Sequence, residues 1–272
     1  LYAILNSRYL HKKRIEKMKR IFKMFMPYGL IVLKKKYRDY REFKNKEGKE
    51  YDFDIIFSIG TACRPARYLK NHELRICANP LDWMMSYSLD TVIHLYKTDF
   101  KDFFIHFSAD KIKPNWFIDM NNKITSIHYK EIGLDAQGFN RKMRNRFKKA
   151  HEKLKKANKI CFICNRNENV EIFSNFLNEM SQIYSGKITL INIRNNNSID
   201  NHQPIIKHYK KDISDRLMLI EYEFNDIHKN GNDKTTNADF WLGNEDLWNS
   251  IIKKIYLNMN FISYLLWKSS AR

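Results

Sequence analysis

The sequence predicts an α/β fold in which an open, mostly parallel sheet is flanked by helices. Short, continuous apolar runs, typical of buried parallel strands, alternate along the chain with amphipathic segments of helical spacing. The run Lys159–Cys164 is such a strand, and a helix expected over 169–184 leads to a second strand at Lys187–Ile193. This strand–helix–strand order is typical of units whose strands lie parallel in one sheet.

The other elements follow from the same two periodicities. A basic helix is expected over 8–24, and the charged segment 34–50 is expected to be a linker or a short helix. The globular part begins at about Tyr51, with a strand over 52–60 that ends in Gly60. Further along the chain we expect helices over 88–107, 135–158 and 244–257, a strand over 217–224, and polar loops over 195–203 and 225–239.

Composition and charge limit the class of protein. The chain has 272 residues, of which 43% are hydrophobic and 14% aromatic, enough to bury a core and to exclude a mainly disordered chain. Most of the net charge of +19 lies in residues 1–50, with 16 Lys and Arg against 5 acids, and in residues 141–159, with 10 against 1. Basic residues are therefore not spread over a face with aromatic stacking partners, and nucleic acid is not an expected partner.

We predict three parts: a basic N-terminal arm over 1–50, an α/β domain over 51–252 and a C-terminal helical tail over 253–272. No secretory signal is visible, and the apolar run 25–33 is too short to span a bilayer, so a cytoplasmic location is expected. The charge of the arm suits a peripheral contact with an anionic inner membrane surface, and a solvated basic helix is the simpler alternative. The first residue is Leu1, and Met18 could serve as an internal start.

The four cysteines do not form a disulfide framework in a chain of this length. Cys161 and Cys164 have Cys-x-x-Cys spacing, but no second pair accompanies them, so we expect no metal and no cofactor. Together with Cys77 they stand in apolar surroundings typical of a core.

The turn after the first predicted strand is the most informative segment. Cys63 follows Gly60 and falls in the turn or the first turn of a helix. The positive end of the helix dipole, with Arg64 and Arg67 nearby, is expected to favour the thiolate that a nucleophilic cysteine needs. Open α/β sheets place their sites at this carboxyl end of the strands. Cys63 is therefore a candidate nucleophile, and a buried structural cysteine is the alternative.

Two further residue types complete a candidate site. Asp82, beside Trp83 in an apolar stretch, is expected to be a partly buried carboxylate that needs a partner such as Arg75 or a histidine. A helix N-cap is the alternative role for Asp82. His128 ends a β-like stretch and could face a helix N-terminus as a general base, although on pattern alone it is one of five comparable histidines.

These motifs resemble those of a bacterial family of unknown function that is described as a papain-like cysteine peptidase. The family has Ser-Leu-Gly-x-x-Cys-x-x-Ala-x-x-Leu, then Leu-Arg, Pro-Phe-Asp-Trp, a histidine, a basic helix, a strand ending in Arg, and Trp-x-Gly-x-x-x-x-Trp. The matching segments, within about residues 52–252, are Ser58–Leu69, Leu74-Arg75, Pro80–Trp83, His128, 141–158, Ile160–Arg166 and Trp241–Trp248.

The resemblance implies that Cys63 is the nucleophile, His128 the base and Asp82 a site carboxylate. Tyr129 stands where an Asp often follows the family's histidine, which leaves Asp82 or Asp119 to orient the imidazole. Two smaller departures are Ala62, where Asn is frequent, and Leu81 in place of Phe.

The resemblance and the residues point to different folds. A papain fold places its cysteine on a helix packed against an antiparallel, barrel-like domain. The alternating strands and helices predict a strand–turn–helix, which is closer to a nucleophile elbow.

The expected function is a cysteine hydrolase that acts on peptide or other acyl bonds. Backbone N–H groups at the Cys63 turn would hold the oxyanion. A transferase of surface-glycan assembly, with a phosphate-bearing donor near Gly60 and the basic helix, and a non-catalytic binding module are the alternatives. The expected substrate is a small molecule, peptide or glycan, and the residues expected to bind it are Gly60, Arg64, Arg75, Trp83 and Arg166.

Overall fold

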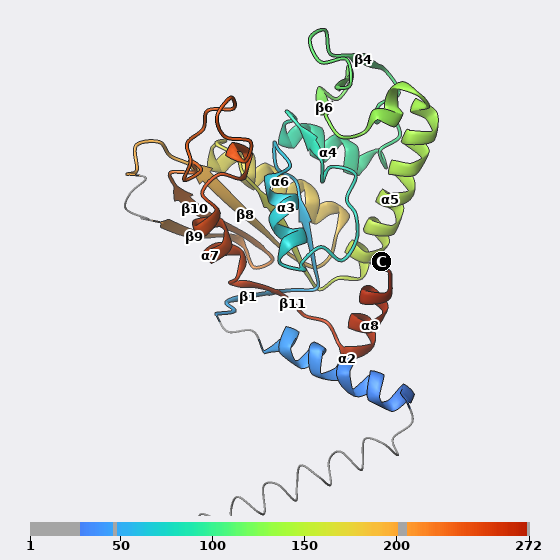
Figure 1. Ribbon diagram of the computed structural model, residues 1–272, viewed down its shortest axis with the longest axis vertical. Coiled ribbons are helices and arrows are strands. Elements are labelled where there is room, and N and C mark those ends of the chain that lie inside the picture. Colours follow the sequence, from blue (N-terminus) through green and yellow to red (C-terminus); the bar gives the residue numbers. More distant parts are fainter. Residues whose placement is uncertain (1–27, 46–47, 201–205, 271–272) are drawn as a thin grey trace, which may run out of the picture. The chain divides into compact units, whose positions relative to one another are not determined.

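The computed structural model describes residues 28–45, 48–200 and 206–270 (Figure 1). The helix predicted over 8–24 and the start at Met18 lie outside these residues. The chain divides into two compact units, one of residues 48–258 and one of residues 1–47 with 259–272. Each unit is described by itself below.

A five-stranded sheet forms the centre of residues 48–258, in the order β2-β7-β8-β10-β9. The first four strands pair in parallel, and only β9 is antiparallel to its neighbour β10. The parallel strands carry buried apolar side chains, as expected for strands that are covered on both faces. The α/β fold with a mostly parallel sheet that the sequence predicts is therefore confirmed. The strands are β2 (Ile55–Ser58), β7 (Lys159–Cys164), β8 (Lys187–Asn195), β10 (Leu217–Phe224) and β9 (Lys207–Ser214).

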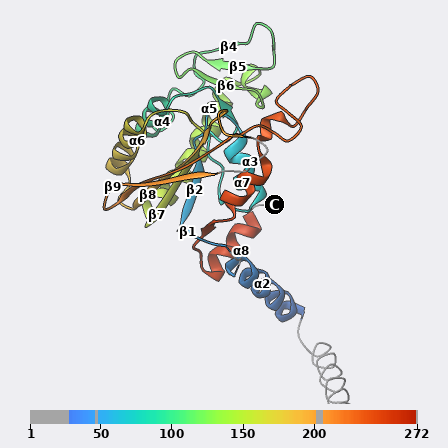
Figure 2. The ribbon, with the colours of Figure 1, turned by 90° about the vertical axis from the view of Figure 1, so that its left-hand side faces the viewer.

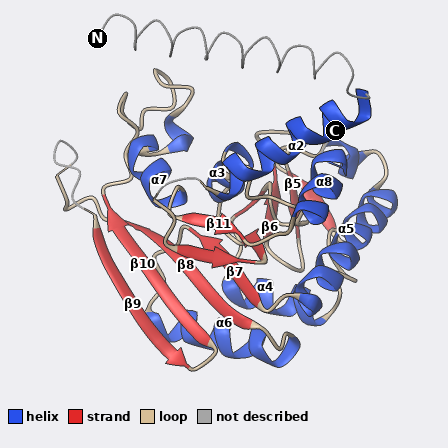
Figure 3. Cartoon of the chain, turned by 90° about the horizontal axis from the view of Figure 1, so that it is seen from below, coloured by secondary structure: helices blue, strands red, loops and turns tan. Residues whose placement is uncertain are grey.

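Helices cover both faces of this sheet. In Figures 2 and 3, α4 and α6 lie on one side of the sheet, and α3 and α7 lie on the other. Asp135 caps α5 by accepting a hydrogen bond from the Gly138 N–H, and Asn169 caps α6 in the same way. The helices are α3 (Arg64–Asn71), α4 (Leu89–Lys97), α5 (Ala136–Lys156), α6 (Val170–Ile183) and α7 (Glu245–Ile252).

Three expected elements differ in the structure. The helix expected over 88–107 ends at Lys97, because Asp99, Phe100 and Phe104 have positive φ angles that an α-helix cannot contain. The strand expected over 52–60 is split into β1 (Tyr51–Phe53) and β2. β1 pairs in parallel with β11 (Ile255–Leu257), which replaces the end of the helix expected over 244–257.

A second, antiparallel sheet has the order β3-β6-β5-β4; β3 precedes α4 in the chain, and the other three strands follow it. This sheet carries His128 just after one of its strands, and a 3₁₀ turn (Lys130–Gly133) follows. A further 3₁₀ turn (Phe240–Leu242) precedes α7. The strands are β3 (Met84–Met85), β4 (Phe107–Ala109), β5 (Phe117–Asp119) and β6 (Ile124–Ser126).

The other unit pairs two helices, α2 (Tyr28–Lys44) and α8 (Phe261–Ser270). Aromatic rings hold them together, with Tyr37 edge-on to Phe261 at 5.2 Å and Phe43 against Tyr264 at 5.3 Å. Most of the segment that we expected as a linker or short helix is thus the second half of a 17-residue helix. Within the described ranges, no helix is both long and apolar enough to cross a membrane.

Candidate active site

Cys63 lies in the turn between β2 and α3, at the carboxyl end of the central sheet. β2 ends at Ser58 and α3 begins at Arg64, so Cys63 occupies the N-cap position of the helix, without a capping hydrogen bond from its side chain. Pro65 stands in the first helical turn, where the backbone N–H groups have no intrahelical partner. The side chain of Cys63 is buried against this turn.

The second sheet brings His128 to this thiol. The Sγ atom of Cys63 lies 3.5 Å from Nε2 of His128, although the two residues are 65 positions apart. The ring of Trp83 stands edge-on to the imidazole, with the centroids 5.8 Å apart. His128 itself is exposed, so the thiol–imidazole pair opens to solvent on the histidine side.

The environment of the pair favours its neutral form. Burial raises the pKa of the Cys63 thiol to about 11, and the charge of Asp82 adds to this rise. Desolvation of the His128 ring lowers the pKa of its imidazole. The expectation that the helix dipole and two arginines favour the thiolate was therefore wrong, because the cost of burying a thiolate is the largest effect.

Asp82 is the centre of a buried hydrogen-bond cluster. Its Oδ2 accepts from Arg75 Nε at 2.7 Å and from the Asn79 N–H at 2.8 Å, and its Oδ1 accepts from the Ser58 hydroxyl at 2.9 Å. Burial raises the pKa of this carboxyl, and the Arg75 guanidinium opposes the rise. Since Ser58 is the last residue of β2, the cluster fixes the strand end that leads to Cys63.

The contacts of His128 include no carboxylate among the described residues. Asp82 is engaged as above, and Asp119 accepts hydrogen bonds from the backbone N–H groups of Phe104 and Asn122. The hydroxyl of Tyr129 accepts from Arg146 on α5, away from the imidazole. The structure therefore brings Cys63, His128 and Trp83 together, while the two carboxylates that we expected as orienting groups hold other parts of the chain.

Arg166 and Gly60 both contribute to the packing of the chain that follows β2. The buried guanidinium of Arg166 donates to the carbonyl of Ile59 at 3.1 and 3.2 Å and pairs with Glu168 at 2.9 Å. A Cβ on Gly60 would lie 2.6 Å from Asn165 Oδ1 and 2.7 Å from Pro65 Cγ. The close packing of this turn thus requires a residue without a side chain at position 60.

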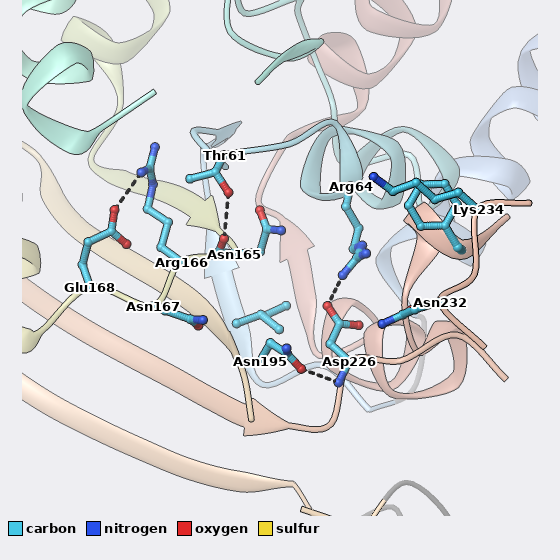
Figure 4. Close-up of a pocket in the computed structure, with 12 residues that line it drawn as sticks. Thr61, Arg64, Asn165, Arg166, Asn167, Glu168, Asn195, Asp226, Asn232 and Lys234 are labelled. Carbon is cyan, nitrogen blue, oxygen red and sulfur yellow. Dashed lines mark hydrogen bonds and ion pairs between the residues drawn. The ribbon is translucent and has the colours of Figure 1, made fainter. Parts of the chain in front are cut away.

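A pocket of about 690 Å³ opens beside the Cys63 turn (Figure 4). It stands where β2, β7, β8 and β10 end, which is where parallel sheets bind their ligands. Arg64 and Arg166 line it, whereas Arg75, Trp83 and Cys63 do not. The lining residues are Thr61, Arg64, Asn165, Arg166, Asn167, Glu168, Ile193, Asn195, Asp226, Asn232, Lys234 and Phe240.

Asp226, which the sequence analysis missed, holds the start of α3 from a loop 162 positions after Arg64. Its carboxylate pairs with Arg64, the residue after Cys63, and accepts from the indole N–H of Trp248 at 3.0 Å. Trp248 stacks on Tyr68 of α3, with centroids 4.9 Å apart. The available signal was the position of Asp226 just after the apolar strand 217–224, at the edge where sites form.

Gly243 explains part of the Trp-x-Gly motif. Its φ angle of +67° lies in the region that favours glycine, and a Cβ there would collide with both Asp226 and Arg64. The carbonyl of Trp241, two residues earlier, accepts a hydrogen bond from Arg64 Nε at 2.6 Å. The motif therefore surrounds the ion pair that holds the start of α3.

Among the described residues, no group of three or more His, Cys, Asp or Glu side chains could hold a metal ion.

Comparison with known proteins gives one match. The model of the family DUF1796, described as "putative papain-like cysteine peptidase", matches residues 54–208. No curated protein and no solved structure matches the chain. The matched region contains Cys63, Asp82 and His128 and ends before Asp226. Because this region is more than half of the chain, the protein belongs to the DUF1796 family of putative papain-like cysteine peptidases.

Proposed function

We propose that the protein is a cysteine hydrolase that cleaves peptide or related acyl bonds with Cys63 and His128. The observation that carries this proposal is the 3.5 Å contact between Sγ and Nε2 at the N-terminus of α3. A thiol within reach of an imidazole is the arrangement that nucleophilic catalysis by cysteine requires. The family description, which names a cysteine peptidase, supports the same chemistry.

The reaction starts from a neutral thiol and a neutral imidazole. His128 Nε2 takes the proton of Cys63 as Sγ bonds to the substrate's carbonyl carbon, and N–H groups at the start of α3 stabilise the oxyanion. The tetrahedral intermediate collapses with cleavage of the bond to the leaving group, which receives the proton from His128. Water then attacks the thioester with His128 as base, releasing the acid and restoring the thiol.

Asp82 acts in this scheme as a positioning residue. It contacts neither Cys63 Sγ nor His128 by a hydrogen bond, and it joins Arg75 and Asn79 to the end of β2. Its carboxylate therefore supports the geometry of the Cys63 turn and takes no part in proton transfer.

The proposed setting is the cytoplasm, with a peripheral contact at an anionic membrane surface. The described part of the arm supports this contact, because Tyr28, Leu30 and Leu33 at the start of α2 are exposed and three lysines, 34–36, follow directly. Exposed apolar side chains next to lysines suit the boundary between lipid headgroups and acyl chains.

Turnover of a fluorogenic peptide library tests the proposed chemistry. Wild-type protein should release the fluorophore, while Cys63→Ala and His128→Ala should each lose at least about 100-fold, the scale of a lost general base. Cys77→Ala is the matched control, since this thiol contacts no histidine among the described residues. Release by Cys63→Ala at the wild-type rate would refute the proposal.

A further inference from the structure

The pocket beside the Cys63 turn is lined in part by asparagine side chains that make no hydrogen bond to other described residues. Asn165, Asn167 and Asn232 line it, and the side chains of all three make no hydrogen bond within the described ranges (Figure 4). Each carboxamide offers two N–H donors and one acceptor oxygen. The Oδ1 atom of Asn165 is moreover buried beside Gly60 without a hydrogen-bond partner, an arrangement that costs free energy.

The charges in the pocket are largely neutralised by one another. Arg64 pairs with Asp226, and Arg166 pairs with Glu168. Of the cations that line the pocket, this leaves Lys234 without an ion pair among the described residues. A phosphate-bearing ligand is bound by free guanidinium or backbone N–H groups that can approach it together. Because both arginines are already paired with carboxylates, the pocket favours an uncharged polar ligand over a nucleotide or a phosphorylated sugar.

The pocket is within reach of the thiol. Thr61 and Arg64, which flank Cys63, both line it, and the Thr61 hydroxyl donates to the carbonyl of Asn165 at 3.3 Å. Its volume of about 690 Å³ lies in the range of pockets that enclose a small ligand. Because an extended chain advances about 3.3 Å per residue, a segment held there reaches Cys63 within a few residues.

We propose that this pocket is a substrate subsite that takes a short peptide segment with carboxamide or hydroxyl side chains next to the bond that Cys63 attacks. This inference rests on the proposed function. Peptide N–H and C=O groups, together with polar side chains, supply hydrogen-bond partners that the described protein groups do not give Asn165, Asn167 and Asn232. An apolar side chain in the same place would displace the water that the exposed Asn167 and Asn232 amides bind and would offer no hydrogen bond in return, which lowers the affinity of such a ligand.

Affinity-guided alkylation of the full chain tests the subsite. The probes are plain chloroacetamide and two chloroacetylated tetrapeptides, one built from Asn, Gln, Ser and Thr and the other from Leu and Val. Mass spectrometry measures the labelling rate of Cys63. The polar probe should label at least about tenfold faster than the apolar probe. Asn167→Ala with Asn232→Ala should reduce this preference at least fivefold, while the exposed Asn145→Ala on α5, outside this pocket, should keep it.

The outcomes separate the subsite from the proposed chemistry. Equal labelling by both peptides, with plain chloroacetamide still dependent on His128, overturns the subsite and leaves the hydrolase in place. Protection of Cys63 by inorganic pyrophosphate, but not by the unmodified polar tetrapeptide, also overturns it in favour of a phosphate site. Labelling by plain chloroacetamide that is unaffected by His128→Asn contradicts the proposed function instead.

Discussion

Asp226 and Arg64 form an ion pair across 162 residues of sequence, and Arg64 is the residue directly after Cys63. Both side chains are largely buried, with exposed fractions of 17% for the arginine and 4% for the aspartate. A contact from the loop after β10 thus holds Arg64, the residue with which α3 begins, directly after the thiol.

Removal of this contact should destabilise the protein. Asp226→Ala leaves a largely buried guanidinium without its partner, a loss that typically costs about 3–5 kcal/mol in the free energy of unfolding. Urea titration measures the loss. The control is Glu131→Ala, which removes an exposed ion pair with Lys142 and should cost at most about 1 kcal/mol. Equal losses in the two variants would show that the Arg64 contact is not structural.

Asp82→Asn should also lower stability, because the neutral amide cannot balance the Arg75 charge. We expect a loss of about 3–5 kcal/mol in the free energy of unfolding. Ser58→Ala, which removes one neutral donor from the same carboxylate, should cost only about 1 kcal/mol. If thermal melts of Asp82→Asn match the wild type while turnover is lost, Asp82 has a direct role in the chemistry and the positioning role is wrong.

Gly60→Ala should disturb the turn that holds Cys63. Its Cβ would lie 2.6 Å from Asn165 Oδ1 and 2.7 Å from Pro65 Cγ, so both side chains must move. We expect about 1–3 kcal/mol less stability, as for other overpacked sites, and slower alkylation of Cys63. Gly29→Ala is the control, because nothing lies within 4 Å of the added atom and alanine favours the helix. A Gly60→Ala protein as stable as Gly29→Ala would contradict the packing argument.

Without His128, the reactivity of Cys63 should keep rising with pH. The thiolate is the species that iodoacetamide attacks, and the pKa of this thiol is about 11. In His128→Asn, where no base assists the thiol, the thiolate fraction between pH 7 and 10, and with it the alkylation rate, should therefore rise about tenfold per pH unit. A thiol whose pKa lies near or below 7 would instead give a rate that is flat over this range. That flat profile would contradict the high pKa of the buried thiol.

Vesicle sedimentation tests the contact of the arm with anionic lipid. Each lysine near such a surface contributes on the order of 1 kcal/mol, and salt weakens the attraction. Replacing Lys34, Lys35 and Lys36 by Glu should therefore abolish sedimentation with phosphatidylserine vesicles. The same change at Lys148, Lys149 and Lys153, exposed on α5, is the control. Equal loss in both triple variants would indicate attraction by net charge alone.

The sequence predicted those parts of the site whose conformation depends on residues adjacent in the chain. The strand–turn–helix around Cys63 follows from an apolar run, Gly60 and a proline. Five histidines were comparable on pattern, and only the family resemblance singled out His128, since its contact depends on how the small sheet packs. Asp226 and β9 were missed for different physical reasons. The partner of Asp226 is far away in sequence, and β9 is almost wholly exposed and polar, so no apolar run marks it.

The most direct test of the account is the dependence of Cys63 alkylation on His128. Mass spectrometry measures the rate at which iodoacetamide labels Cys63 near pH 7.5, relative to Cys77 in the same chain. This ratio should fall at least about tenfold in His128→Asn, because the variant keeps a polar side chain but removes the base. His106→Ala, at another exposed histidine, should leave the ratio unchanged. An unchanged ratio in His128→Asn would show that the 3.5 Å contact does not activate the thiol, and the proposed hydrolase would fail.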